Sequence, residues 1–347
     1  MWRTVDYSLR QISAYNWYCT RSFRQTNGGS TIETLASKIK IKKKSGVFHE
    51  LKKNKVLFVM IVPTIVFFLI NSYSPMVGIY FAFTKYTFDG GLFGSPFVGL
   101  DNFQFLLKSG KLRQLTINTI GYNFSFIVLG HSLAIFIAVM LNEVRSKFYK
   151  KLTQSIMFLP YFVSFVILNV IAYNLFNYEF GFWNATLNDW GLEPMDIYNT
   201  PWAWVILIPI FYLWRFLGYF SIIYLAAIAG ISEEYYEAAR IDGANAFQRI
   251  RFITVPLLKP TFIILFLFSL GSILRGQFEL FYQLVGSNSM VWSTTDIIDT
   301  YVFRTLRVTF DIGLGTAAGL YQSAFGFILI ITVNWIVRRV DPDNALF

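Results

Sequence analysis

Six stretches of this sequence are almost entirely apolar, and polar residues gather in the segments between them. Each stretch exceeds the ~20 residues that an α-helix needs to cross the hydrocarbon core of a bilayer. The pattern therefore predicts an all-α integral membrane protein with six transmembrane helices. These helices are expected over residues 56–83, 117–141, 152–176, 202–230, 257–282 and 314–337. A polar run from Asn71 to Pro75 interrupts the first helix, which is expected to kink or to end there.

Composition agrees with lipid as the main solvent of this chain. Of the 347 residues, 55% are hydrophobic and 14% are charged, whereas about a quarter of the residues in a typical soluble domain are charged. The formal net charge is +10, and residues 1–55 contain 12 Lys or Arg against three acidic residues. A basic segment directly before an apolar run is typical of a cytoplasmic flank that faces anionic lipid. We therefore expect contact with membrane lipid and no nucleic-acid partner.

The distribution of Lys and Arg between the loops predicts how the helices are oriented. With the N-terminus in the cytoplasm, the cytoplasmic segments hold 22 Lys or Arg and the outer loops hold six. Both termini are then cytoplasmic. The expected parts are a basic cytoplasmic N-terminal segment (1–55), a transmembrane domain (56–340) with a cytoplasmic loop at 231–256, and a short C-terminal tail (341–347).

Few residues are suited to catalysis or to metal binding. Cys19 is the one cysteine, so no disulfide can form within the chain and no metal site with several cysteines is possible. Of the two histidines, His49 and His131, the second lies in an apolar stretch and is expected to be packed and hydrogen-bonded. The sequence has no Gly-x-x-x-x-Gly-Lys-Ser/Thr motif, which would hold the phosphates of a nucleotide. We therefore expect no enzyme activity and no cofactor on this chain.

The cytoplasmic loop between the fourth and fifth apolar stretches has strong local signals. Ser232 is a good N-cap residue, and the two acidic residues after it complement the dipole of a helix. Gly243 allows a tight turn, a second short helix can run to about residue 252, and Pro256 marks the entry to the next span. Small residues at Ala238 and Ala239 leave a flat surface on which another protein can pack. The loop is predicted to be a helix-turn-helix element shaped for docking.

The same loop carries a pattern at fixed spacing: Glu237-Ala238-Ala239, three residues, Gly243, nine residues, Ile253, one residue and Val255-Pro256. This pattern resembles the "EAA" loop of ABC importer permeases, with Val255 in place of the usual leucine. Two outer segments, residues 73–80 and the Gly-x-x-Asn-Phe run within 97–103, are similar to those of the carbohydrate-uptake branch. The resemblance covers roughly residues 56–340, and its layout looks like that of permeases for oligosaccharides or polysaccharide fragments.

The resemblance implies a type I ABC importer permease in a bacterial cytoplasmic (inner) membrane. The 231–256 loop would form a coupling helix on a cytoplasmic ATPase dimer, which would hold ATP and Mg, and a second homologous permease would complete the pathway. An extracytoplasmic solute-binding protein would meet the outer loops 179–200 and 284–312. Asp296, Asp299 and the acidic residues of 179–200 could form polar contacts there, and the sequence singles out none of them. The residues expected to couple to the ATPase are Glu237, Ala238, Ala239, Asp242, Gly243 and Pro256.

Polar and aromatic residues within the spans are candidates for a solute pathway, because charged residues at membrane depth usually face a cavity. Tyr212, Arg215 and Tyr219 share one face of the fourth predicted helix. In the fifth, Arg275 and Glu279 lie at i and i+4, followed by Tyr282 and Gln283. Aromatic rings stack on sugar faces and the polar groups bond hydroxyls, so such a pathway suits a saccharide, and the two arginines suit an acidic one.

The same residues allow other interpretations. Arg275 and Glu279 can form an ion pair within their helix, Arg215 can pair across a subunit interface, and the aromatic rings can pack against lipid or protein. An ion-gradient-driven secondary transporter is the alternative function, although Glu279 is the only carboxylate within a predicted span and no internal repeat is seen. A membrane enzyme would need a catalytic cluster, and none is recognisable.

Overall fold

A computed structural model describes residues 54–340. Most of the predicted N-terminal segment 1–55, with Cys19 and His49, and the predicted tail 341–347 lie outside this range. The chain divides into two compact units, Met1–Ser74 and Pro75–Phe347. The described part of the first unit is helical: α4 (Lys55–Phe68) is followed by the π-helix η2 (Leu69–Tyr73). No residue of either element is buried, as expected for apolar side chains that lipid covers. At the predicted polar run the α-helix changes to a π-helix, and the helical segment continues to Phe83.

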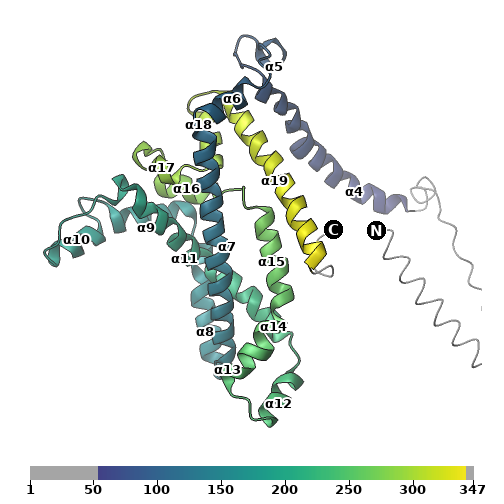
Figure 1. Ribbon diagram of the computed structural model, residues 1–347, viewed down its shortest axis with the longest axis vertical. Coiled ribbons are helices and arrows are strands. Elements are labelled where there is room, and N and C mark those ends of the chain that lie inside the picture. Colours follow the sequence, from purple (N-terminus) through teal and green to yellow (C-terminus); the bar gives the residue numbers. More distant parts are fainter. Residues whose placement is uncertain (1–53, 341–347) are drawn as a thin grey trace, which may run out of the picture. The chain divides into compact units, whose positions relative to one another are not determined.

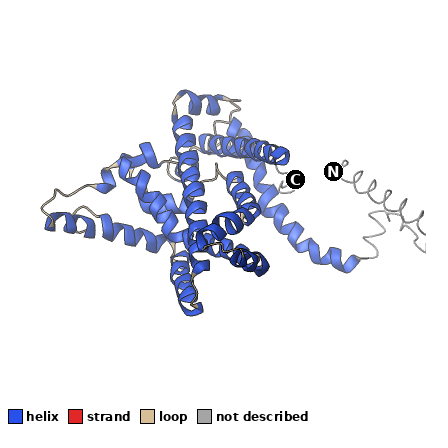
Figure 2. Ribbon diagram, turned by 60° about the horizontal axis from the view of Figure 1, so that its bottom comes forward, coloured by secondary structure: helices blue, strands red, loops and turns tan. Residues whose placement is uncertain are grey.

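Helices make up almost all of the second unit, and its described residues contain no β-strand (Figure 2). The longest are α7 (Lys111–Glu143), α11 (Pro201–Ala229) and α19 (Ile312–Val340). α7 and α11 pack along each other and supply about half of the buried apolar core (Figure 1). Within this core the rings of Phe126 and Tyr212 stack with their centroids 3.9 Å apart.

Four described helices are long and apolar enough to cross a membrane, and two bent helix pairs raise the number to as many as six. The four are Lys55–Phe83, Lys111–Glu143, Pro201–Ala229 and Ile312–Arg339. Each contains or closely matches one of the predicted apolar stretches. The other two predicted stretches fall on the bent pairs.

The predicted helix over 152–176 is not continuous. α8 (Lys147–Phe158) and the 3-10 helix η4 (Leu159–Phe162) meet α9 (Phe165–Phe176) at a bend of 95°. Ser164 begins α9 because its hydroxyl accepts a hydrogen bond from the amide of Ile167 at 3.3 Å. A serine N-cap after a proline is a signal of a new helix that the apolar content of this stretch obscured.

The predicted helix over 257–282 is wrong in its second half. α15 (Lys259–Gly271) ends early, residues 272–277 form a non-helical linker, and a separate helix α16 (Phe278–Val285) follows. The main chain of this linker is hydrogen-bonded to side chains of α18 and α19. At its N-terminal end α15 is preceded by α14 (Val255–Leu257), and the helical segment Ala246–Leu257 meets α15 at a bend of 52°.

Short elements join the long helices, and several of them lie at the end away from the 231–256 loop (Figure 1). They are α5 (Gly91–Gly94), α6 (Asp101–Lys108), α10 (Phe182–Asp189), η5 (Ile197–Asn199), η7 (Ser289–Val291), α17 (Trp292–Thr295) and α18 (Ile298–Arg307). α18 packs against α19. Asn102 in the Gly-x-x-Asn-Phe run donates hydrogen bonds to the carbonyl oxygens of Ala82 and Thr84, both at 3.0 Å. This motif therefore fastens α6 to the segment before it.

The expectation that Asp296 and Asp299 offer polar contacts to an outside protein is wrong. The carboxylate of Asp296 is fully buried between Lys111, at 2.8 Å, and Arg304, at 2.7 Å. The guanidinium of Arg304 also lies 3.8 Å from the ring centroid of Trp292. These ion pairs hold the segment before α18 onto the start of α7. Asp299 is half-buried and bonded within the protein.

Candidate functional site

The loop between α11 and α15 folds as the helix-turn-helix that the sequence predicts. α12 (Glu233–Ile241) begins at Ser232, whose hydroxyl accepts a hydrogen bond from the Glu234 amide at 3.4 Å. Gly243 has a φ of +79°, which a residue with a side chain rarely adopts, and so permits the turn. After α13 (Ala246–Arg249) the chain continues as the π-helix η6 (Ile250–Thr254) into α14.

The outward surface of this loop is apolar at its tip. Ile241 is 87% exposed, and Phe247 and Phe252 are 68% and 69% exposed. Glu237 and Ala238 are exposed beside them. Contiguous apolar side chains rimmed by charged ones mark a protein-interaction site more often than a free surface. The exposure of Glu237 and Ala238 fits the docking element that the sequence predicts for this loop.

The inner side of the loop has two hydrogen bonds of its own and one ion pair with α7. The Tyr236 hydroxyl lies 3.0 Å from the hydroxyl of Thr254. Arg249 donates a hydrogen bond to the Ala244 carbonyl oxygen at 3.0 Å and lies 3.8 Å from the carboxylate of Glu143, at the end of α7. The loop is therefore connected directly to the end of α7.

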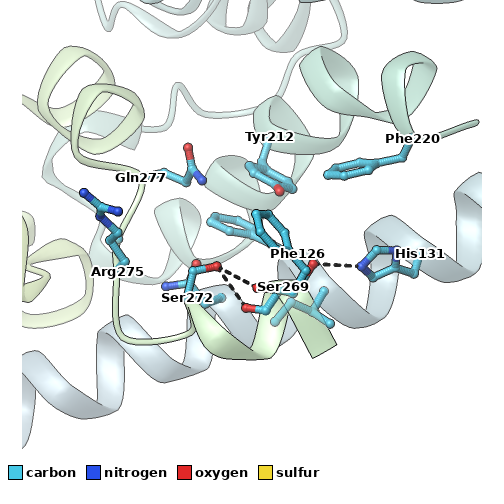
Figure 3. Close-up of a pocket in the computed structure, with 12 residues that line it drawn as sticks. Phe126, His131, Tyr212, Phe220, Ser269, Ser272, Arg275 and Gln277 are labelled. Atoms are coloured by element: carbon cyan, nitrogen blue, oxygen red, sulfur yellow. Dashed lines mark hydrogen bonds between the residues drawn. The ribbon is translucent and has the colours of Figure 1, made fainter. Parts of the chain in front are cut away.

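A cavity of about 290 Å³ lies deeper in the helix bundle, beside the linker 272–277 (Figure 3). Its walls come from α7, α11, α15 and the linker. The lining combines aromatic rings with amide, hydroxyl and guanidinium groups: Asn123, Phe126, Ile127, His131, Tyr212, Phe220, Phe268, Ser269, Ser272, Arg275, Gly276 and Gln277. This mixture is able to stack against a sugar ring and to bond its hydroxyls.

Three helices meet at a hydrogen-bonded triad on one wall of the cavity. His131 of α7 lies 2.8 Å through Nδ1 from the Tyr224 hydroxyl of α11, and 3.1 Å through Nε2 from Ser269 of α15. Ser269 donates its own proton to the Leu265 carbonyl oxygen at 2.9 Å. Nε2 must then carry the histidine proton, and Tyr224 donates to Nδ1. His131 is packed and hydrogen-bonded, as the sequence predicts.

The candidate residues on α11 separate into two groups. Tyr212 is buried and lines the cavity. Arg215 turns toward the bend between α8 and α9, with its guanidinium 4.1 Å from the ring centroid of Phe165. Tyr219 stacks on Tyr161 at 4.9 Å. Within the described part of the chain, Nε and Nη1 of Arg215 are buried without a hydrogen-bond partner.

The candidates near α16 do not share one helix. Arg275 is exposed in the linker and lines the cavity, whereas Glu279 lies in α16. The predicted i, i+4 arrangement of these two residues is therefore wrong, and among residues 54–340 no ion pair joins them. Tyr282 packs between Phe278 and Phe303, at 5.3 and 5.0 Å between ring centroids.

Sequence reasoning missed several polar residues of the cavity wall. Asn123, Ser269 and Ser272 are small polar residues in apolar stretches, and such residues are common as packing elements in membrane helices. Gln277 lies in the linker, where the sequence predicts an uninterrupted helix. The signal that pointed to it was Gly276, a glycine next to two polar residues in the middle of a supposed span.

Residues 130–342 match the model of a protein family described as the binding-protein-dependent transport system inner membrane component. This chain belongs to that family. The family is a transport permease component and not an enzyme. The permease is 32% identical to Protein LplB of Bacillus subtilis over 294 residues, which cover 85% of this chain and 92% of that protein.

Two further relatives of the permease are informative. It is 31% identical to the polygalacturonan/rhamnogalacturonan transport system permease protein YteP of Bacillus subtilis, over 88% of this chain and 94% of that one. It also resembles a chain in the crystal structure of a bacterial ABC transporter involved in the import of the acidic polysaccharide alginate. That comparison has a TM-score of 0.78 and 31% identity, over 86% of this chain and all of the other. None of these relatives supports the ion-gradient-driven alternative.

Proposed function

We propose that this permease forms part of the membrane pathway of an ATP-driven importer for saccharides, with acidic oligosaccharides as the solute class. The observation that carries the proposal is the exposed helix-turn-helix over Ser232–Pro256, with its apolar tip, in a chain of this family. Similarity to permeases for polygalacturonan and alginate supports the solute class. Tyr212, Arg275 and Gln277 in the cavity wall suit it chemically.

The proposed arrangement in the membrane has six crossings with both termini in the cytoplasm of a bacterium, at the inner membrane. Each bent helix pair then counts as one crossing. The excess of Lys and Arg in the predicted cytoplasmic segments supports the orientation. α15 has 13 residues, a rise of about 20 Å against a hydrocarbon core of about 30 Å. The linker after it thus lies within the membrane, where non-helical backbone is tolerated only around a protein-lined or water-filled space.

The coupling loop is proposed to dock on a cytoplasmic ATPase dimer, which binds ATP and Mg. Closure of that dimer would pull on the loop, and the contacts of Arg249 and Tyr236 would pass the movement to α7 and η6. Glu237, Ala238 and Asp242 would contact the ATPase. Gly243 would allow the turn.

A second homologous permease is proposed to complete the pathway, and an extracytoplasmic solute-binding protein to deliver the solute. The first is supported by Arg215, whose buried nitrogens lack a partner within the described residues, because a charged group at membrane depth is costly when unpaired. Either a carboxylate of the second permease or an acidic solute would satisfy it. The binding protein is supported by the relative whose alginate transporter was crystallised with an alginate pentasaccharide-bound periplasmic protein.

The test is purification of the complex followed by uptake into vesicles. A second permease and an ATPase should co-purify, and ATP should drive uptake of an acidic oligosaccharide. Arg215→Ala, Glu279→Gln and Gln283→Ala should each be compared with Thr332→Ala, whose hydroxyl bonds only its own helix. Normal uptake by the first three variants would remove their side chains from the pathway. Uptake that persists without the ATPase would refute the proposed energy source.

A further inference from the structure

The linker 272–277 is held from behind by two side chains that do not line the 290 Å³ cavity. We propose that Asp299 and Gln322 are positioning residues that fix Arg275 for contact with the solute. This inference rests on the proposed function of the cavity as part of the solute pathway. It assigns a role in solute recognition to residues that the solute does not touch.

Three hydrogen bonds form this clasp. Oδ2 of Asp299 in α18 accepts from the Gly276 amide at 2.7 Å and from Nε2 of Gln322 in α19 at 2.9 Å. The same Nε2 donates to the Leu274 carbonyl oxygen at 2.6 Å. The peptide groups on both sides of Arg275 are therefore fixed by one network. The partners that α18 and α19 supply add to the turn hydrogen bonds within the linker, such as the one from the Arg275 amide to the Ser272 carbonyl oxygen at 2.8 Å.

Gly276 lies close to the side chains of the clasp. A Cβ atom built at position 276 would lie 2.6 Å from Oδ2 of Asp299 and would overlap the side chain of Ile297. A side chain there would therefore displace the Asp299 carboxylate and disturb its hydrogen bond to the linker. Glycine at this place is thus explained by the clasp and not by a positive φ, since Gly276 is absent from the positive-φ glycines.

The clasp matters for Arg275 because this residue borders two spaces. A second cavity, of about 500 Å³, lies on the other side of the linker and is lined by Asp299 and Gln322 as well as by Arg275 and Ser272. The linker is the partition between the two cavities. A linker freed from α18 and α19 can turn the guanidinium away from the solute and toward the Asp299 carboxylate. The hydrogen bonds of the clasp prevent this by fixing the main chain.

The role assigned to Asp299 depends on an oxygen that accepts hydrogen bonds and not on its charge. Asp299→Asn keeps such an oxygen, whereas Asp299→Ala removes it, and Gln322→Leu removes the donor. Ser323→Ala is a matched control, since Ser323 is the next residue of α19 and its hydroxyl bonds only the Gly319 carbonyl oxygen of its own helix.

The decisive experiment is a double-mutant cycle in the complete importer, with ATP-driven uptake of alginate pentasaccharide and of galacturonate oligomers as probes. Asp299→Ala and Gln322→Leu should each lower kcat/KM by about tenfold, mainly through KM, because two buried groups lose their partners. Asp299→Asn and Ser323→Ala should stay within about twofold of the wild type. In an Arg275→Ala background, Asp299→Ala should cause no further loss. An equal loss in both backgrounds, or equal losses for Asp299→Asn and Asp299→Ala, would overturn the inference.

A labelling measurement gives a result that does not depend on transport. In a Cys19→Ser background, Gln277→Cys should react with a membrane-impermeant sulfonate thiol reagent at a rate that Asp299→Ala or Gln322→Leu changes by about tenfold. Asp299→Asn should leave the rate as it was. Unchanged rates in all three variants would show that the linker needs no clasp. If the wild-type importer takes up neither probe, the proposed solute class fails, while the labelling result still decides on the clasp.

Discussion

Gly218 of α11 lies directly against the main chain of Met157 in α8, and a Cβ atom at position 218 would overlap the Met157 carbonyl group. This contact seats α8 on α11 just before the 95° bend. Small residues let membrane helices approach closely where the apolar environment gives little other drive to associate. Gly218 therefore determines how the bent helix pair is placed on the bundle.

Gly218→Ala is expected to destabilise the protein by about 1–3 kcal/mol, because the added methyl group has no space and backbone must shift. The measurement is the thermal unfolding midpoint of the purified permease in detergent. Gly121→Ala is the control, since nothing lies within 4 Å of a Cβ atom there. A Gly218→Ala variant with the same unfolding midpoint as the wild type would contradict the close packing of α8 on α11.

His131→Leu is expected to cost about 1–3 kcal/mol of stability, because the fully buried Tyr224 hydroxyl loses its partner. Adding Tyr224→Phe removes the orphaned hydroxyl and should recover part of this loss. Thermal unfolding of the two single variants and the double variant measures the coupling. Strict additivity of the two changes would mean that the hydrogen bond contributes nothing.

Ile241→Asp is expected to abolish co-purification of the ATPase without changing the unfolding midpoint of the permease, because this side chain is 87% exposed at the loop tip. Leu192→Asp serves as the control, since Leu192 is also an exposed apolar residue, 54% exposed, in the predicted outer loop. Loss of the ATPase from both variants would point to a general defect. Retention by Ile241→Asp would exclude the apolar tip as the docking surface.

The stability of the permease is expected to fall as pH rises through the range in which Asp299 ionises. Burial raises the pKa of the Asp299 carboxyl, although hydrogen bonds from Gly276 and Gln322 and the nearby charge of Arg275 oppose the rise. Between the ordinary Asp value and this raised value, the unfolded chain has released its proton and the folded chain still holds it. The free energy of unfolding therefore decreases as pH rises, and the decrease is complete above the pKa of Asp299 in the folded protein.

Asp299→Asn should remove this component of the pH dependence and raise the unfolding midpoint near neutral pH. Unfolding midpoints of the two proteins from pH ~4 to pH ~7 test this. The difference between them should grow with pH and then level off. Curves that run parallel over the whole range would show that the carboxyl ionises equally well in the folded and unfolded chains.

The sequence predicts the long helices well because their lengths follow from the thickness of the bilayer. The stretches 117–141 and 314–337 lie inside α7 and α19, and 202–230 matches α11 within one residue at each end. The end of α15 was not predictable in this way. It depends on Asp299, 23 residues from Gly276, and on Gln322, 48 residues from Leu274. No local pattern contains such partners.

The same distinction applies to the candidate site. The docking loop could be predicted because its cap, its turn and its exposed face all lie within Ser232–Pro256. The cavity wall could be predicted only in part: Tyr212 and Arg275 were found from their chemistry. The His131 triad joins residues 93 and 138 positions apart, and only packing of three helices brings them together.

The break after α15 has a consequence for the membrane as an electrical insulator. Peptide groups that no helix continues attract water when they lie between lipid tails. Turn hydrogen bonds satisfy the amides of Ser272, Ile273 and Arg275, and the clasp bonds the Leu274 carbonyl and the Gly276 amide. In the proposed membrane position, the linker and the cavities beside it form a polar spot within the barrier. Protons and small ions would then have a shorter apolar path to cross, so closure at one end during every step of transport would be needed to preserve ion gradients.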